Sequence, residues 1–178
     1  FMAVPIPLVV TAVDDGRYLR ANEAAVHYLA APGSTGLAGR SIADSIGIDD
    51  RRRAIAELRE RGRIEALEVP LRDGQGRMRE AVITAASVPI GPSQAFAAGI
   101  VDVTERNAAA AQMRWQATHD ALTGLPNRLL FQEKLNEALA RDTPGVVALF
   151  LIDLDDFKAV NDTLGHDVGD QLLVAVGD

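Results

Sequence analysis

The sequence predicts an α+β protein in two parts joined by a helix. Short segments with strand-like alternation, separated by turn residues, fill most of residues 1–104. A continuous apolar run at 146–152 leads directly into a cluster of carboxylates, as a buried strand of an α/β sheet would. Residues 105–118 are rich in alanine and favour a helix. We therefore predict an N-terminal domain at 1–104, a linker helix at 105–118 and a second segment at 119–178.

The composition is that of a soluble globular protein, with 48% hydrophobic and 24% charged residues. The longest strongly apolar run has seven residues, whereas about 20 are needed to span a bilayer as a helix. The chain has no cysteine, which excludes disulfides and thiolate metal sites within it. A cytoplasmic location is expected.

Negative charge is concentrated in the second part of the chain. Residues 1–104 hold 12 arginines and 13 carboxylates, whereas residues 105–178 hold 6 basic side chains and 12 carboxylates. Such a segment would repel nucleic-acid phosphates unless a cation intervened, so we expect no nucleic acid partner and look for a divalent metal. The acids that surround the single Lys158 are Asp153, Asp155, Asp156, Asp162, Asp167 and Asp170.

The first part begins with two strands and two helices. Leu8–Val13 and Tyr18–Ala21 flank a hairpin turn that contains Gly16. A short helix is predicted at Glu23–Ala30, and a second helix runs from the acidic pair at 49–50 to about residue 62. The second helix is rich in arginine, which we interpret as a solvated face in preference to an anion-binding site.

Three further strands are predicted in the order of an antiparallel meander. Leu67–Leu71 alternates with polar residues, and turns then separate Met78–Ile90 from Ala95–Val103. Small side chains on the last two strands either leave a ligand cavity or let a helix approach closely. Close packing favours the second, so no cofactor is assigned. These small residues are Ala81, Ala85, Ala86, Ala97, Ala98 and Gly99.

The order of two strands, helices and three strands, with Asn22 at the end of the second strand, resembles a PAS domain over residues 5–104. The exit Asp102-Val103-Thr104-Glu105-Arg106 resembles the D-x-T-E-R segment that joins PAS domains to output modules. The resemblance implies a five-stranded antiparallel sheet with helices, a sensor role and an unknown ligand. Thr104 or Asp102 is expected to cap the linker helix.

The second segment opens with the string Asp120-Ala-Leu-Thr-Gly-Leu-Pro-Asn127-Arg128. Residue patterning alone predicts a loop that precedes an amphipathic helix. The string itself closely resembles the D-x-L-T-G-L-x-N-R opening signature of GGDEF domains. Asp120, Asn127 and Arg128 are expected to tie this loop to its domain.

Carboxylates follow the apolar run Val146–Ile152, which is predicted to be a central strand covered on both faces. Asp153 and Asp155 are hard oxygen donors suited to Mg²⁺, which normally completes its shell with water and substrate phosphates. Alternatively, Asp155 or Asp156 caps the next helix, which leaves Asp153 unexplained. The acidic strand end therefore indicates a magnesium–nucleoside triphosphate site.

The pattern D-x-D-x-F-K-x-x-N-D-x-x-G-H-x-x-G-D, starting at Asp153, resembles the GGDEF family almost position for position. The resemblance covers residues 117–178 and implies an α/β fold. Apart from the resemblance, His166 is interpreted as stabilising a loop at Gly165–Gly169 rather than as a metal ligand or a base. The resemblance also implies that metal is bound by the Asp153 carboxylate and the Leu154 carbonyl. Guanine of GTP would be bound by Asn161 and Asp170, and the triphosphate would lie against Phe157 and Lys158.

For the parent protein, the resemblance implies a diguanylate cyclase that converts two GTP into cyclic di-GMP and pyrophosphate under PAS control. The two-fold symmetric product suggests a homodimer formed through the PAS domain and linker helix. The G-G-[DE]-E-F hairpin is expected beyond Asp178, so we expect no turnover by this chain and poor stability of 119–178. The alternatives are a degenerate GTP-binding GGDEF domain, or a GGDEF–EAL phosphodiesterase of cyclic di-GMP.

Overall fold

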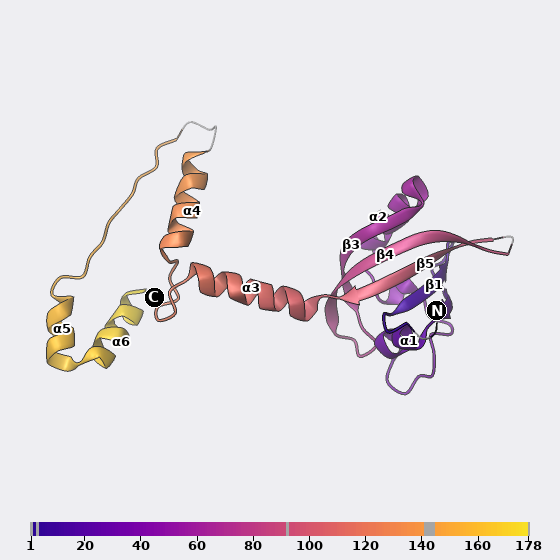
Figure 1. Cartoon of the computed structure of the whole chain (residues 1–178), viewed down its shortest axis with the longest axis horizontal. Coiled ribbons are helices and arrows are strands. Elements are labelled where there is room, and N and C mark those ends of the chain that lie inside the picture. Colours follow the sequence, from indigo (N-terminus) through magenta and orange to yellow (C-terminus); the bar gives the residue numbers. More distant parts are fainter. Residues whose placement is uncertain (1, 3, 92, 141–144, 178) are drawn as a thin grey trace. The chain divides into compact units, whose positions relative to one another are not determined.

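A computed structural model describes residues 2, 4–91, 93–140 and 145–177. The chain forms two compact units, Phe1–Asn107 and Ala108–Asp178 (Figure 1). Among the described residues, no helix combines the length and the apolar character that crossing a membrane requires.

The first unit is built on a five-stranded antiparallel sheet with the strand order β2-β1-β5-β4-β3 (Figure 1). The strands are β1 (Leu8–Ala12), β2 (Tyr18–Ala21), β3 (Arg63–Arg72), β4 (Met78–Ile90) and β5 (Ser93–Asp102). Each neighbouring pair is antiparallel. The predicted sheet and its meander of β3, β4 and β5 are confirmed.

Helices cover the sheet and close the core. They are α1 (Glu23–Leu29), the short 3₁₀ helix η1 (Ile42–Asp44) and α2 (Ile48–Arg61). α2 is capped at its C-terminal end by Gly62, whose φ of 72° is a left-handed conformation that glycine adopts without steric cost. The core joins both helices to the sheet, and its most deeply buried apolar side chains are Leu29, Ile64, Leu71, Ile100 and Val9.

Asn22 connects β2, α1 and the N-terminal segment. Asn22 is 0% exposed, and its side-chain oxygen accepts hydrogen bonds from the amides of Ala25 and Leu8, both at 2.9 Å. Its amide group donates to the carbonyls of Val4 and Ile6, at 3.0 Å and 2.8 Å. The residue is therefore both the N-cap of α1 and a clamp on the chain that precedes β1.

The turn between β3 and β4 is organised by a buried carboxylate. Asp73 accepts hydrogen bonds from the amides of Gln75 and Arg77 and from both Arg77 Nε and Arg79 Nε, at 2.9–3.3 Å. Burial alone would raise the pKa of Asp73, but the hydrogen bonds from Arg77, Arg79 and Gln75 outweigh it and lower the pKa to about 2. The turn is thus held by an ionised carboxylate.

Acid should remove the stabilisation that Asp73 provides. Because its pKa is below the ordinary value of 3.8, the ionised form stabilises the fold above about pH 4 and this contribution disappears as pH falls towards 2. We expect Asp73→Asn to lower the free energy of unfolding at neutral pH by about 2 kcal/mol. Urea titrations at several pH values would measure this, and the variant should lose less stability than the parent between pH 4 and 2. If the parent and Asp73→Asn lost the same stability between pH 4 and 2, the role assigned to Asp73 would be contradicted. Asp49→Asn is the control, because Asp49 forms an exposed ion pair.

The last strand passes into a helix at the predicted exit. Asp102 accepts a hydrogen bond from the Tyr28 hydroxyl of α1 and another from the Thr104 amide, both at 2.9 Å. The Thr104 hydroxyl does not cap α3 (Thr104–Thr118) but accepts from the amide of Glu80 on β4. Asp102, by contrast, binds the first amide of the helix. The exit motif therefore joins α1, β4, β5 and the start of α3.

The second unit contains α4 (Arg128–Leu139), α5 (Phe157–Leu164) and α6 (His166–Gly177). The prediction that 165–169 forms a loop is wrong, because only Gly165 separates the helices and α6 begins at the next residue. Gly165 has φ of 89°, so the reversal between the helices is placed on a residue without a side chain.

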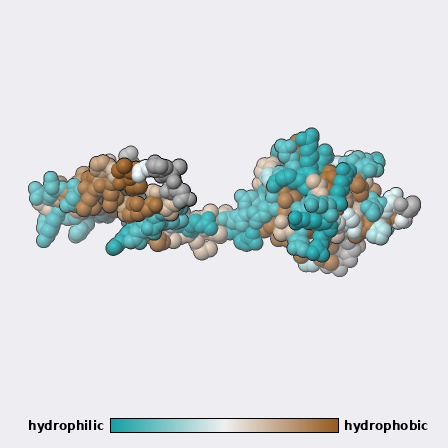
Figure 2. All heavy atoms as spheres, turned by 90° about the horizontal axis from the view of Figure 1, so that it is seen from above, coloured by the Kyte–Doolittle hydropathy of each residue, from teal (hydrophilic) through white to brown (hydrophobic). Residues whose placement is uncertain are grey.

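The predicted central strand Val146–Ile152 is not formed. None of these residues lies in a strand, and Val146 and Leu151 are 98% and 99% exposed. Exposed hydrophobic side chains of the second unit are visible in Figure 2. A strand needs a neighbour to pair its amides and carbonyls, and no described residue pairs with this segment. The predicted poor stability of 119–178 stays a prediction.

Candidate functional site

The opening loop of the second unit is held by side-chain hydrogen bonds to its own backbone. Asp120 accepts from the amide and the hydroxyl of Thr123, both at 2.9 Å, and from the amide of Leu122. The hydrogen bonds from Thr123 lower the pKa of Asp120. Asn127 caps α4 and donates to the carbonyl of Ala117 at 2.8 Å. The Asp120 contacts stay within the loop, whereas Asn127 joins the loop to Ala117 and to the start of α4. The Arg128 side chain makes no hydrogen bond or ion pair with the described residues, so the tying role expected of Asp120 and Arg128 stays a prediction.

The acidic segment before α5 presents unpaired oxygen donors. Asp153, Asp155 and Asp156 are exposed, and none of their carboxylates has a hydrogen bond or ion pair with the described residues. Asp156 has φ of 54°, an uncommon left-handed conformation, and stands at the N-cap of α5 without a side-chain capping bond. Asp156 therefore occupies the N-cap position of α5, as the alternative interpretation expected, but its side chain does not cap the helix. Asp153 remains free to meet a ligand.

The donor chemistry of this segment fits magnesium. Carboxylate and carbonyl oxygens are the ligands that Mg²⁺ takes, and no salt bridge within the described residues competes for Asp153. No group of three or more ligating side chains is found among the described residues. The carboxylate of Asp153 and the carbonyl of half-buried Leu154 would thus supply part of a shell. Water and phosphate oxygens would have to complete it.

α5 and α6 bring two of the predicted guanine-binding residues into one small region. Gly169 is buried on α6, and a β-carbon built on it would lie 1.8 Å from Oδ1 of Asn161 on α5. Only a residue without a side chain therefore leaves room for the Asn161 amide. Asp170 follows Gly169 directly and is exposed. The packing sets Asn161 beside the backbone that carries Asp170.

The residues expected to meet the triphosphate open α5. Phe157 is half-buried, and Lys158 is exposed and has no ion pair with the described residues. Both follow the acidic segment directly, so an ammonium and several carboxylates lie within a short stretch of chain.

Sequence reasoning did not single out Gly169 as a packing residue. The signal that could have found it was a glycine inside a predicted helix, where glycine is intrinsically unfavourable.

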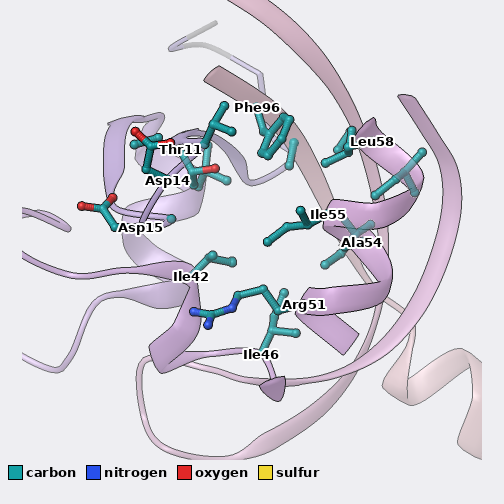
Figure 3. A pocket seen from close by; sticks show the side chains of 18 of the residues that line it. Thr11, Asp14, Asp15, Ile42, Ile46, Arg51, Ala54, Ile55, Leu58 and Phe96 are labelled. Atoms are coloured by element: carbon teal, nitrogen blue, oxygen red, sulfur yellow. The ribbon is translucent and has the colours of Figure 1, made fainter. Parts of the chain in front are cut away.

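A cavity of about 220 Å³ lies in the first unit between α2 and the sheet (Figure 3). Ala85 and Ala98 are among its lining residues. The preferred interpretation of the small residues on β4 and β5, that they only let a helix pack closely, is therefore incomplete. At Ala85 and Ala98 the small side chains line a cavity, which was the other interpretation of these residues.

Residues 117–178 match the family model described as "Diguanylate cyclase, GGDEF domain". The chain is 49% identical over 76 residues to the probable diguanylate cyclase DgcE of Escherichia coli, covering 42% of this chain and 7% of that protein. It is 43% identical over 72 residues to the cyclic di-GMP phosphodiesterase PdeR of Escherichia coli, covering 40% of this chain and 11% of that protein. The chain therefore spans only a small part of the curated relatives it matches.

The first unit matches solved structures at low identity. An RNA-binding light-oxygen-voltage receptor superposes with a TM-score of 0.53 and 16% identity, covering 65% of this chain and 34% of that one. A PAS domain from Desulfitobacterium hafniense superposes with a TM-score of 0.47 and 19% identity, covering 57% of this chain and 95% of that one. The strand order and the match to the receptor carry the fold assignment. The chain thus joins a unit with the PAS fold to a segment, residues 117–178, that matches the GGDEF family model.

Proposed function

We propose that the chain is part of a diguanylate cyclase in which the PAS-fold unit controls a GTP-binding GGDEF domain. The observation that carries the proposal is the family match at 117–178, within which Asn161 packs against Gly169 beside Asp170. The parent protein would join two GTP molecules into cyclic di-GMP. Each 3′ hydroxyl would attack the α-phosphorus of the other GTP, and pyrophosphate would leave.

Guanine recognition follows from the donors and acceptors of the two proposed binding residues. Guanine presents an acceptor at O6 and donors at N1 and N2. The amide of Asn161 can donate to O6, whereas the carboxylate of Asp170 can accept from the N–H groups. Adenine has an amino group in place of O6 and no N1 hydrogen, so the same pair would reject ATP. The proposal therefore includes selectivity for GTP.

The triphosphate would lie along the start of α5. The ammonium of Lys158 would bind phosphate oxygens, and the ring of Phe157 would pack beside them. The carboxylate of Asp153 and the carbonyl of Leu154 would hold Mg²⁺, which when bound neutralises charge on the triphosphate. The three exposed carboxylates would otherwise repel GTP, so binding should depend on the metal. GTP is a cytoplasmic nucleotide, which places the proposed reaction there.

The proposed product also bears on assembly. Cyclic di-GMP is two-fold symmetric, and each half comes from one GTP. Two GGDEF domains, each holding one GTP, would meet around the product, which favours a homodimer. The PAS-fold unit and α3 lie before the GGDEF segment in the chain and are the proposed means of setting the geometry of that dimer.

Calorimetric titration of the chain with GTP and with ATP, each in the presence of Mg²⁺, tests the nucleotide site. We expect GTP to bind more tightly than ATP, and Asp170→Ala to abolish this preference. Asp167→Ala is the matched control, because it removes the same charge from the first turn of the same helix at an exposed position. Equal binding of both nucleotides, or an Asp170→Ala variant that still prefers GTP, would overturn the guanine assignment.

A second candidate function is favoured by the match to PdeR, a cyclic di-GMP phosphodiesterase. In such a protein the GGDEF domain would bind GTP without converting it and would regulate cyclic di-GMP hydrolysis. Incubation of the complete protein with GTP separates the two candidates. Accumulation of cyclic di-GMP supports the cyclase, whereas GTP-stimulated consumption of added cyclic di-GMP supports the phosphodiesterase.

A further inference from the structure

We infer that the cavity in the PAS-fold unit binds a small organic carboxylate with an apolar body, and that Arg51 binds the carboxylate. The site lies wholly within the first unit and needs no GGDEF activity. Binding would give the proposed cyclase a defined chemical signal, but the binding itself can be tested whether or not the protein makes cyclic di-GMP.

The walls of the cavity favour an apolar ligand body. Ile55 and Leu58 of α2 face Phe96 of β5 across the hollow (Figure 3), and the remaining lining is mainly aliphatic. A cavity of about 150 Å³ lined by Leu, Ile and Phe is large enough to take up benzene. At about 220 Å³ this cavity has room for a phenyl ring or a branched chain together with a short acid group.

Arg51 is the cation on the cavity wall that lacks a partner. Its neighbours on α2 are neutralised, since Arg52 lies 3.6 Å from Asp49 and Arg53 forms an ion pair with Asp50. Arg51 itself is half-buried, and its guanidinium makes no hydrogen bond or ion pair with the described residues. Its guanidinium extends from α2 towards Ile42 at the edge of the hollow (Figure 3). A carboxylate in the cavity could pair with it through two parallel hydrogen bonds.

A second polar group also lines the hollow. Thr11 of β1 is 7% exposed, and no described residue hydrogen-bonds its hydroxyl. This hydroxyl could therefore donate a hydrogen bond to a ligand in the cavity or accept one from it. The cavity therefore combines an apolar body with two polar groups, which is the general character of small-molecule sites.

Two carboxylates, Asp14 and Asp15, also line the cavity, and a negative charge there would disfavour an anionic ligand. Asp15 is neutralised by Arg17, whose Nε lies 2.6 Å from Oδ2. Asp14 is exposed and has no hydrogen bond or ion pair with the described residues. Its charge should weaken the binding of an anion and strengthen that of a cation. Asp14→Asn consequently distinguishes the sign of the ligand's charge.

The first experiment compares three probes of matched size on the full chain: phenylacetate, phenylacetamide and phenethylamine. Calorimetry gives the affinities, and amide resonances of Thr11 and Phe96 report where each probe binds. We expect phenylacetate to bind at least about tenfold more tightly than the neutral amide, since a charge-assisted hydrogen bond is lost with the amide. Asp14→Asn should strengthen phenylacetate binding. Preference for phenethylamine, or no saturable binding of phenylacetate at millimolar concentration, would overturn the inference.

Substitutions on α2 test whether Arg51 supplies the positive charge that binds the carboxylate. Arg51→Met should weaken phenylacetate binding by about tenfold or more, and Arg51→Lys should restore only part of it because lysine lacks the planar fork. Arg59→Met is the matched control on the same helix, with an exposed arginine that has no ion pair with the described residues. Equal losses in Arg51→Met and Arg59→Met would show only a general charge effect and would refute the assignment.

A cavity-filling variant keeps the test independent of Arg51. Ala54 lines the cavity from α2 and is half-buried. Ala54→Phe should fill the hollow and abolish the shifts of Thr11 and Phe96 on addition of phenylacetate, while the remaining amide spectrum stays folded. Unchanged phenylacetate affinity in this folded variant would place the binding elsewhere and overturn the proposal.

Discussion

Asn22→Ala is expected to lower the free energy of unfolding of the PAS-fold unit by about 3 kcal/mol. The side chain is 0% exposed and exchanges four hydrogen bonds with Leu8, Ala25, Val4 and Ile6. Alanine would remove all four and would leave the buried amide of Ala25, and the part-buried groups of Leu8, Val4 and Ile6, without these partners. Loss of an N-cap alone costs about 1 kcal/mol, so most of the effect should come from the clamp on the N-terminal segment.

Urea denaturation followed by circular dichroism would measure this loss. Ser41→Ala is the control, because Ser41 also caps a helix but does so at η1 with exposed hydrogen bonds. Asn22→Asp separates the two roles of the amide, since it keeps the acceptor for Ala25 but removes the donors to Val4 and Ile6. A cost for Asn22→Ala no larger than that for Ser41→Ala would show that the buried network contributes little.

The elements of the first unit could be predicted because their signals are local. β4 has the predicted bounds Met78–Ile90, and α2 ends next to the glycine that was expected to stop it. Alternation, turn glycines and capping residues each act within a few positions of the chain. The pairing of β1 with β5 joins distant segments, and residue patterns did not predict it. The resemblance to a known fold implied only that the sheet has five antiparallel strands.

The second unit shows where local reasoning fails. Val146–Ile152 has the composition of a buried strand, but a strand exists only where a neighbour supplies hydrogen bonds, and composition does not report the neighbour. The same limitation applies to the loop expected at 165–169. Residues 165–169 were expected to form a loop stabilised by His166, although of the two glycines only Gly165 takes a conformation that ends a helix.

The candidate sites were predictable in chemistry but not in geometry. The spacing from Asp153 to Asp170 indicated which side chains would bind metal and guanine, and these assignments stay predictions. The sequence did not show that Gly169 makes room for the Asn161 amide. Neither did it show Arg51 on a cavity wall, because a run of arginines on one helix is equally compatible with a solvated surface. Packing between elements decides both cases.

Gly169→Ala should weaken GTP binding by about tenfold or more, contrary to what helix propensity alone predicts. In a helix interior, alanine is favoured over glycine by about 1 kcal/mol, so the substitution should strengthen α6 if nothing else changed. However, the new β-carbon would lie 1.8 Å from Asn161 Oδ1, far inside contact distance. Either the Asn161 amide rotates away or α5 and α6 separate, and overpacking of this kind typically costs about 1–3 kcal/mol.

Gly177→Ala provides the matched control on the same helix. A β-carbon there would meet Leu125 at 3.4 Å, which is an ordinary contact, so the control should keep its GTP affinity. The side-chain amide resonances of Asn161 report the local change directly and do not depend on nucleotide. If these resonances stay in place in Gly169→Ala while GTP binding weakens, the glycine acts on the ligand itself. If they move and GTP affinity is unchanged, Asn161 does not bind guanine and the proposed recognition must rest on Asp170 alone.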